Sequence, residues 1–134
     1  MIASPGEVRL DDLLRISGSG EHANHAFLEE MLLMFIDDNA QRVQAASESV
    51  VRDDPAALRG AVHAIKGSAG LIGAIRLHDL AAELELALVK RRASNLPEAV
   101  EELRLEYTAV VRTLRTKYPQ LSSPNGRIGE SLTQ

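Results

Sequence analysis

The sequence predicts an all-α fold: an antiparallel up-down four-helix bundle with an additional short N-terminal helix. Apolar residues recur at intervals of three and four over four long segments, which is the period of an amphipathic helix. Short connections rich in Gly, Pro and Asp separate these segments, and helices joined by short connections pack antiparallel. With 134 residues, the chain can bury one hydrophobic core without disulfides.

The first two helices are expected at residues 7–16 and 21–51, on either side of a breaker at 17–20. The inward stripe of the second helix consists of Leu28, Met31, Leu32, Phe35, Val43, Ala46 and Val50. This helix is more apolar than one stripe requires. We therefore consider Met31, Met34 and Phe35 as parts of an exposed docking patch, because flexible Met side chains suit a partner surface. Core packing is the alternative for each of them.

The third helix should begin after Asp53 and Asp54, because an acidic cap followed by Pro55 is typical of a helix start. Its inward stripe consists of Leu58, Val62, Ile65, Ala69 and Ile72. We expect this helix to lose its order near Gly70, and we expect Gly73 to form the tight connection to the next helix.

The fourth helix is expected at about 74–92, and the fifth runs from a capped start at 94–98 to Lys117. The inward residues are Leu77, Leu80, Ala81, Leu84 and Leu88 in the fourth helix, and Val100, Leu103, Tyr107, Val110 and Leu114 in the fifth. The basic residues 90–92 end the fourth helix, where cations favour the helix dipole.

The composition limits the classes of function. A net charge of −4 argues against nucleic acid as the main partner. The chain has no cysteine, no secretory signal, and no apolar run of the ~18 residues that a membrane span needs. We therefore expect a soluble, cytoplasmic protein with no membrane partner. Residues 1–118 should form one domain, and the polar segment 119–134 should be a flexible tail.

Residues 59–73 carry the candidate chemistry on one face of the third helix. His63 points about 140° away from the apolar stripe by helical geometry. Around it on the same face lie two cations and three glycines: Arg59, Lys66, Gly60, Gly67 and Gly70. Each glycine in a helix interior costs about 1 kcal/mol relative to alanine. Clearance for a bulky group that approaches the imidazole therefore explains the glycines better than helix stability does.

The setting of His63 suits phosphoryl transfer. A neutral imidazole is a nucleophile near neutral pH, and Lys66 at i+3 can offset the charge of an incoming phosphoryl group. Between Pro55 and His78 there are three basic residues and no acidic one, which suits an anionic partner unless the clustering arises by chance. The sequence thus predicts phosphoryl transfer onto His63, and the alternative is a solvated surface histidine.

The stretch AVHAIKGSAGLIGAIRLHDLAAELE resembles the signature of histidine-containing phosphotransfer (HPt) domains of multistep two-component phosphorelays. The matching positions are His63, Lys66, Gly67, Ser68, Gly73, Leu77, Leu80, Leu84 and Glu85. The helical layout extends the likeness over residues 7–118.

This resemblance implies a phosphoryl carrier, not an enzyme with its own turnover. His63 would accept a phosphoryl group from a receiver-domain aspartate and pass it to another receiver. The partners would be response-regulator receiver domains and a hybrid sensor histidine kinase, and the chain would be a monomer. Mg²⁺ would belong to the partner receiver and no cofactor or metal to this chain, in keeping with the absence of a carboxylate cluster near His63 in the sequence.

The resemblance also implies roles for the residues around the histidine. Lys66 would compensate the phosphate charge, Gly67 would give clearance, and Ser68 would help to orient the ring or the phosphate. A serine on a helix often bonds the preceding turn instead. Partner contacts would come from Arg59, Gly60, Gly70, Met31, Met34 and Phe35.

Other interpretations stay open at this point. A non-phosphorylated adaptor could bind and inhibit a sensor kinase or receiver, although such a binder would not need the His63 nucleophile. The phosphoacceptor domain of a chemotaxis-type kinase shares the helical plan but needs a large ATP-binding extension. The chain is compatible with a stand-alone protein, which Met1 favours, and with a piece of a hybrid kinase. His22 and His25 lack a third ligand at a known metal-site spacing, so they and His78 are expected to be surface residues.

Overall fold

The computed structural model describes residues 2–16 and 25–122. The elements in these residues are the helices α1 (Asp11–Ile16), α2 (His25–Val51), α3 (Pro55–Ile72), α4 (Ile75–Val89) and α5 (Leu96–Lys117), and the 3-10 helix η1 (Pro119–Ser122). This part of the chain contains no β-strand, apart from an isolated antiparallel bridge between Val8 and Ala74. The predicted all-α class is confirmed.

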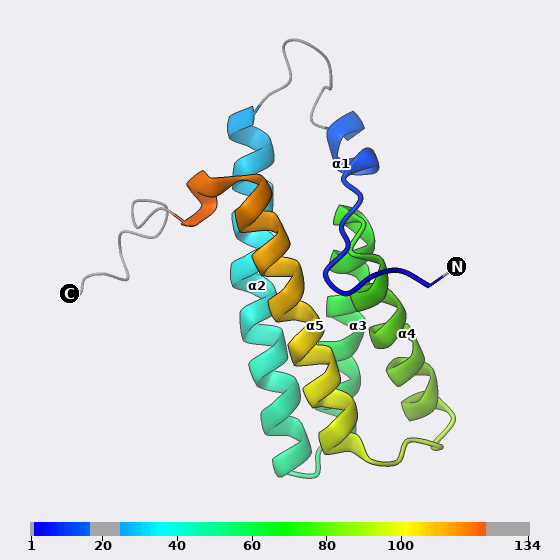
Figure 1. Ribbon diagram of the computed structural model, residues 1–134. Coiled ribbons are helices and arrows are strands. Elements are labelled where there is room, and N and C mark those ends of the chain that lie inside the picture. Colours follow the sequence, from blue (N-terminus) through cyan, green and yellow to red (C-terminus); the bar gives the residue numbers. More distant parts are fainter. Residues whose placement is uncertain (1, 17–24, 123–134) are drawn as a thin grey trace, which may run out of the picture.

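Helices α2 to α5 form the expected up-down bundle (Figure 1). Helix α2 lies next to α3 and α5, and α4 lies next to the same two helices on the other side. Consecutive helices run antiparallel, because the connections between them are short. The short helix α1 packs against α3 at the end of the bundle where α3 meets α4. A four-helix bundle with an additional N-terminal helix is therefore confirmed.

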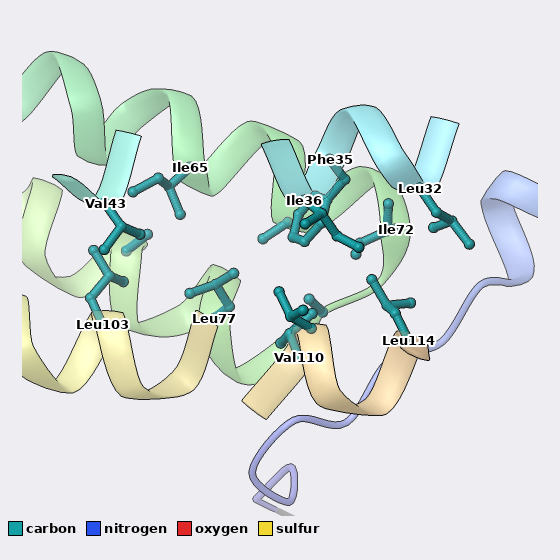
Figure 2. Close-up of a cluster of buried hydrophobic side chains, with 14 of the residues drawn as sticks. Leu32, Phe35, Ile36, Val43, Ile65, Ile72, Leu77, Leu103, Val110 and Leu114 are labelled. Carbon is teal, nitrogen blue, oxygen red and sulfur yellow. The ribbon is translucent and has the colours of Figure 1, made fainter. Parts of the chain in front are cut away.

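The core lies between the four long helices, and Figure 2 shows side chains from each of them pointing toward one another. All five residues of the predicted α3 stripe are buried. The stripe of α2 is wider than predicted, because Ile36 is buried together with Phe35, while Met31 and Val50 are half-buried at its edges. Burial of these stripes is the main force that holds the helices together.

The start of α1 and the end of α3 differ from the prediction. Helix α1 begins at Asp11 and not at residue 7, because Val8 is engaged in the bridge to Ala74. Helix α3 does not lose its order near Gly70 but continues to Ile72. The helix can continue for these two residues because glycine in a helix interior carries only a modest cost when the flanking stripe is buried.

The start of α3 is as predicted, and the end of the domain lies later than predicted. The Asp54 carboxylate accepts a hydrogen bond from the backbone N–H of Ala57, with an N···O distance of 3.1 Å. The sequence places residues 119–122 in the flexible tail, but they form η1, and Leu121 is buried against the bundle. Flexibility stays a prediction for residues 123–134, which lie outside the described residues.

The turn between α3 and α4 depends on Gly73, which has a φ of 73°. The backbone N–H of Arg9 donates to the Gly73 carbonyl oxygen at 2.8 Å. A Cβ on Gly73 would collide with the Arg9 carbonyl oxygen. The positive φ and the close approach of another backbone both require glycine here. Because this turn sets how α4 lies against α3, the segment before α1 helps to fix the register of the two helices.

A buried carboxylate ties the same segment to α5. Glu106 is 4% exposed, and its Oε2 accepts a hydrogen bond from the Gly6 backbone N–H at 2.7 Å. The Nε of Arg76, on α4, lies 3.4 Å from Oε1 of Glu106. Burial raises the pKa of Glu106, and the Gly6 hydrogen bond and the Arg76 charge oppose that rise. The N-terminal segment, α4 and α5 thus meet at one polar group.

We predict that Gly73→Ala lowers the free energy of unfolding by about 2–4 kcal/mol, because alanine is strained at this φ and its Cβ displaces Arg9. Chemical denaturation followed by circular dichroism measures the change. Gly60→Ala is the matched control, since a Cβ there meets nothing within 4 Å. It should raise the free energy of unfolding by up to about 1 kcal/mol. Equal stability of Gly73→Ala and wild type would contradict the role given to this turn.

Candidate functional site

His63 lies in the middle of α3, and 67% of its side-chain surface is exposed. Its Nδ1 lies 2.7 Å from Oε2 of Glu85 on α4. A carboxylate accepts hydrogen bonds, so the contact selects the ring form with a proton on Nδ1. In the neutral ring this tautomer leaves the lone pair on Nε2. The contact therefore leaves Nε2 as the ring nitrogen with the free lone pair on an exposed imidazole.

The second oxygen of the same carboxylate holds Lys66. The Lys66 Nζ lies 2.6 Å from Oε1 of Glu85, and both side chains are less exposed than that of His63. The sequence analysis noted no carboxylate cluster near His63, and it did not foresee this single carboxylate, because Glu85 stands 22 residues away in sequence and reaches His63 only through the packing of α4 on α3. The resemblance to the HPt signature includes Glu85 among the matching positions but implies no role for it.

The shared contacts change the acidity of Glu85. The hydrogen bond from Lys66 is the largest cause that lowers the pKa of this carboxyl group, burial opposes it, and the hydrogen bond to His63 lowers the pKa further. Glu85 is therefore ionised at neutral pH. Its charge is balanced by Lys66 in the resting chain, and it is also placed to stabilise any positive charge that develops on the His63 ring.

The glycines on the outer face of α3 are not required by the packing of the chain itself. A Cβ at Gly60 or at Gly67 would meet no atom within 4 Å, and one at Gly70 would make only an ordinary contact with His78, at 3.5 Å. Alanine at these positions would favour the helix. Space around the His63 ring is the remaining physical use for these residues, which agrees with the clearance inferred from the sequence.

Comparison with known families adds to this geometry. The family model of the Hpt domain, the histidine-containing phosphotransfer domain, matches residues 30–113. This is more than half of the chain. The chain belongs to the Hpt domain family. Hpt domains are phosphocarriers of phosphorelays, in which they interact with receiver domains and kinases. No curated protein and no solved structure gives a significant match.

Ser68 lies apart from the other site residues of this Hpt domain. Its Oγ accepts a hydrogen bond from Nδ2 of Asn39 on α2, at 2.9 Å. Asn39 is fully buried, and its Nδ2 also donates to the Phe35 carbonyl oxygen at 2.8 Å. Since Ser68 follows His63 by five positions, it faces α2, whereas His63 faces α4. Sequence reasoning missed Asn39, although a polar residue within the apolar stripe of α2 was a visible signal.

The predicted docking residues of α2 line a shallow groove against α3, on the other side of His63 from Glu85. The lining residues are Met31, Met34, Phe35, Asp38, Arg42, Ala64, Ser68, Leu71 and Ile72. Met34 is 51% exposed and Met31 is half-buried, so both can offer apolar surface. Phe35 is buried and packs near Tyr107, with ring centroids 6.4 Å apart. It is a core residue, and the prediction that it belongs to an exposed patch is wrong.

The other histidines of this Hpt domain have different surroundings. The Nδ1 of His78 lies 3.1 Å from the neighbouring Asp79 carboxylate, and no ion pair brings a lysine to that carboxylate within the described residues. His22 lies outside the described residues, and nothing is described of the His25 side chain. In the part of the chain that is described, no three His, Cys, Asp or Glu side chains gather as metal ligands, and no helix has the length and hydropathy to cross a bilayer.

We predict that Lys66→Met raises the pKa of Glu85 toward its ordinary value of 4.5, because the largest cause of the depression is removed. His63→Gln should raise it less. NMR titration of the Glu85 carboxyl carbon measures both shifts. Since the folded-state pKa is lowered, the stabilising contribution is present above the unfolded-state pKa and is lost as pH falls through the folded-state value. The stability difference between wild type and Lys66→Met should therefore vanish in acid. An unchanged Glu85 pKa in Lys66→Met would contradict the ion pair.

Proposed function

We propose that this Hpt domain carries a phosphoryl group on Nε2 of His63. It accepts the group from the aspartate of one receiver domain and passes it to the aspartate of another, without catalytic turnover of its own. The observation that supports this proposal is the contact between His63 Nδ1 and Glu85 at 2.7 Å. It leaves an exposed Nε2 with a free lone pair on a face that glycines keep open.

The transfer needs no proton movement within this chain. The Nε2 lone pair attacks phosphorus, the bond from phosphorus to the aspartate oxygen breaks, and the aspartate leaves as a carboxylate with the electron pair. Nδ1 keeps its proton, so the phosphorylated ring becomes cationic. The Glu85 carboxylate beside Nδ1 stabilises that cation. In the second transfer the N–P bond breaks and its electrons return to Nε2, which restores the starting ring.

Lys66 and Arg59 are the proposed sources of positive charge for the phosphoryl group. Lys66 lies one turn after His63, and Glu85 fixes its Nζ at 2.6 Å. Arg59 lies one turn before His63 and is exposed. Positioning and charge neutralisation dominate catalysis of phosphoryl transfer. In place of an orienting role in the chemistry, we assign Ser68 to the contact between α3 and α2, because Asn39 engages its hydroxyl.

We propose that a divalent metal, where the reaction uses one, is held by the receiver. Phosphoryl transfer generally uses a cation that bridges phosphate oxygens. The Glu85 carboxylate beside His63 already has both oxygens engaged by His63 and Lys66, which leaves it poorly suited to bind a metal ion. The receivers, the kinase and the cytoplasmic location stay predictions.

The direct test is transfer from a panel of phosphorylated receiver domains to wild type and to His63→Gln. We expect label on the wild type alone, lost in acid and stable in alkali, as for a phosphoramidate bond. If neither protein takes up label while both bind a receiver, the carrier function is wrong. The non-phosphorylated adaptor would then replace it.

We predict that Glu85→Ala slows transfer by up to about 100-fold, because the ring loses the group that fixes its orientation and tautomer. Glu85→Gln should retain part of the rate, since its amide oxygen can still accept from Nδ1. Rapid-quench kinetics measure the rates, and ¹⁵N NMR of His63 measures the tautomer. Glu83→Ala, on the same helix and exposed, is the control. Wild-type rates in Glu85→Ala would refute the role of the carboxylate.

We predict that Gly67→Ala stabilises the fold and that Gly67→Leu impairs phosphoryl transfer. Alanine should raise the free energy of unfolding by about 0.5–1 kcal/mol, because it favours the helix and meets open space. Leucine should reduce transfer strongly, because its side chain occupies the space that a receiver needs beside His63. Ala40→Leu, at an exposed position on the α5 side of α2, controls for added apolar surface. Full transfer by Gly67→Leu would show that clearance is not the reason for this glycine.

A further inference from the structure

The cations on the face around His63 fall into two classes. Lys66 is paired with Glu85 at 2.6 Å, so its charge is balanced in the resting chain. On α3, and from the C-terminal end of α4 to Arg92, four exposed cations have no side-chain hydrogen bond or ion pair with the described residues: Arg59, Lys90, Arg91 and Arg92. In the resting chain, positive charge near His63 that is not already balanced by an ion pair therefore comes from these four residues.

The four cations lie on one side of the reactive ring. His63 contacts Glu85 and the two helices are antiparallel, so Arg59 and the C-terminal end of α4 lie toward the same end of the bundle. Lys90, the C-cap of α4, follows Glu85 by about 8 Å along the helix axis, and Arg91 and Arg92 follow directly after the helix end. That distance is within about one Debye length at 0.1 M ionic strength. The cluster therefore acts on any charged group that is brought to His63.

The backbone conformation of Arg91 indicates that the positive charge at the end of α4 does more than cap the helix. The N–H of Arg92 donates to the Ala87 carbonyl oxygen at 2.8 Å, and the N–H of Arg91 donates to the Leu88 carbonyl oxygen at 3.2 Å. This pair of hydrogen bonds is the Schellman motif, a helix end that favours glycine at the position of Arg91. Arg91 instead has a φ of 56°, where a Cβ is strained. Favourable interaction with the helix dipole does not require a cation at that strained position, since Lys90 and Arg92 lie on either side of it.

Apolar surface lies between the reactive ring and the cations. Leu86 is 53% exposed and Val89 is 48% exposed, and both follow Glu85 on α4 within about one turn. Protein interfaces commonly combine an apolar centre with a charged rim that steers the encounter. The α3–α4 face has this composition on the side of His63 away from the Met groove.

We propose that Arg59, Lys90, Arg91 and Arg92, with Leu86 and Val89, form a docking surface for the anionic rim of the receiver's phosphoaspartate pocket. The proposal rests on the proposed function, because it takes a receiver as the occupant. An aspartyl phosphate is anionic, and a pocket that holds Mg²⁺ is lined by carboxylate and other oxygen ligands. Its charge is thus complementary to four free cations on a chain whose net charge is −4.

The first experiment compares two triple charge reversals in the full chain. Lys90→Glu/Arg91→Glu/Arg92→Glu alters the proposed surface. Arg112→Glu/Arg115→Glu/Lys117→Glu alters the end of α5 and changes the net charge by the same amount. The probe is the unphosphorylated, metal-free receiver domain that binds the wild type most tightly within a panel. Isothermal titration calorimetry at low and high ionic strength measures the dissociation constant, and circular dichroism checks the fold.

We expect the α4 variant to bind the receiver about 10-fold or more weakly at low ionic strength, with the difference shrinking as salt is added. The α5 variant should stay close to wild type. Equal weakening in both variants, or binding of none of the receivers, overturns the docking surface. If His63 is labelled while the α4 variant binds normally, the carrier function stands and this inference fails. If receiver binding depends on the α4 cations but His63 takes no label, the surface stands and the carrier function fails.

A single substitution separates stability from docking. Arg91→Gly relieves the strained backbone and removes one cation, so it should raise the denaturation midpoint while weakening receiver binding by about 3-fold or more. A cation that served only the helix end would give no loss of binding. That result would contradict the inference even if the triple variant were impaired by misfolding.

Discussion

One carboxylate organises the reactive face of this Hpt domain. Glu85 accepts from His63 Nδ1 with one oxygen and pairs with Lys66 through the other. The first contact decides which ring nitrogen carries the lone pair, and the second lowers the pKa of Glu85 so that it stays ionised. A solvated histidine would exchange between tautomers and orientations. In the proposed function, the contact with the carboxylate favours one tautomer and one orientation of the ring before a receiver binds.

The rest of the fold can be understood as the support for that contact. Glu85 and His63 stand on different helices, so their separation depends on the register of α4 against α3. That register is set by the turn at Gly73, against which the backbone of Arg9 packs. The segment before α1 is held in turn by the buried Glu106 through Gly6. On the far side of α3, Asn39 and Ser68 join the reactive helix to α2.

The sequence predicted the features that depend on local periodicity, and it missed those that depend on tertiary contact. The outward position of His63 and the buried stripe of α3 follow from the helical period, and both are confirmed. The sequence gives Glu85 no role, because the pattern of charges along one helix does not show which residues of the next helix lie beside it. Phe35 was placed on a surface because a wide apolar face does not show which edge the neighbouring helix covers.

The N-terminal segment shows the same limit in backbone terms. Apolar residues at loosely helical spacing over 7–16 predict a helix, but Val8 bridges to Ala74 instead, and a bridge between segments so distant in sequence leaves no periodic signal. Leu121 is a similar case, because one apolar residue in a polar segment does not predict that η1 packs on the bundle. The glycines around His63 gave the opposite result, since their lack of an internal packing role was foreseeable from their outward position.

The most direct test of the account is ³¹P–¹⁵N correlation NMR on the chain after it has taken a phosphoryl group from a receiver domain. The proposed function predicts a phosphorus nucleus coupled to Nε2 of His63, with Nδ1 protonated beside Glu85. Phosphorus coupled to Nδ1 would mean that the contact with Glu85 does not exist in the reacting protein. Phosphorus on any other residue would contradict the central claim.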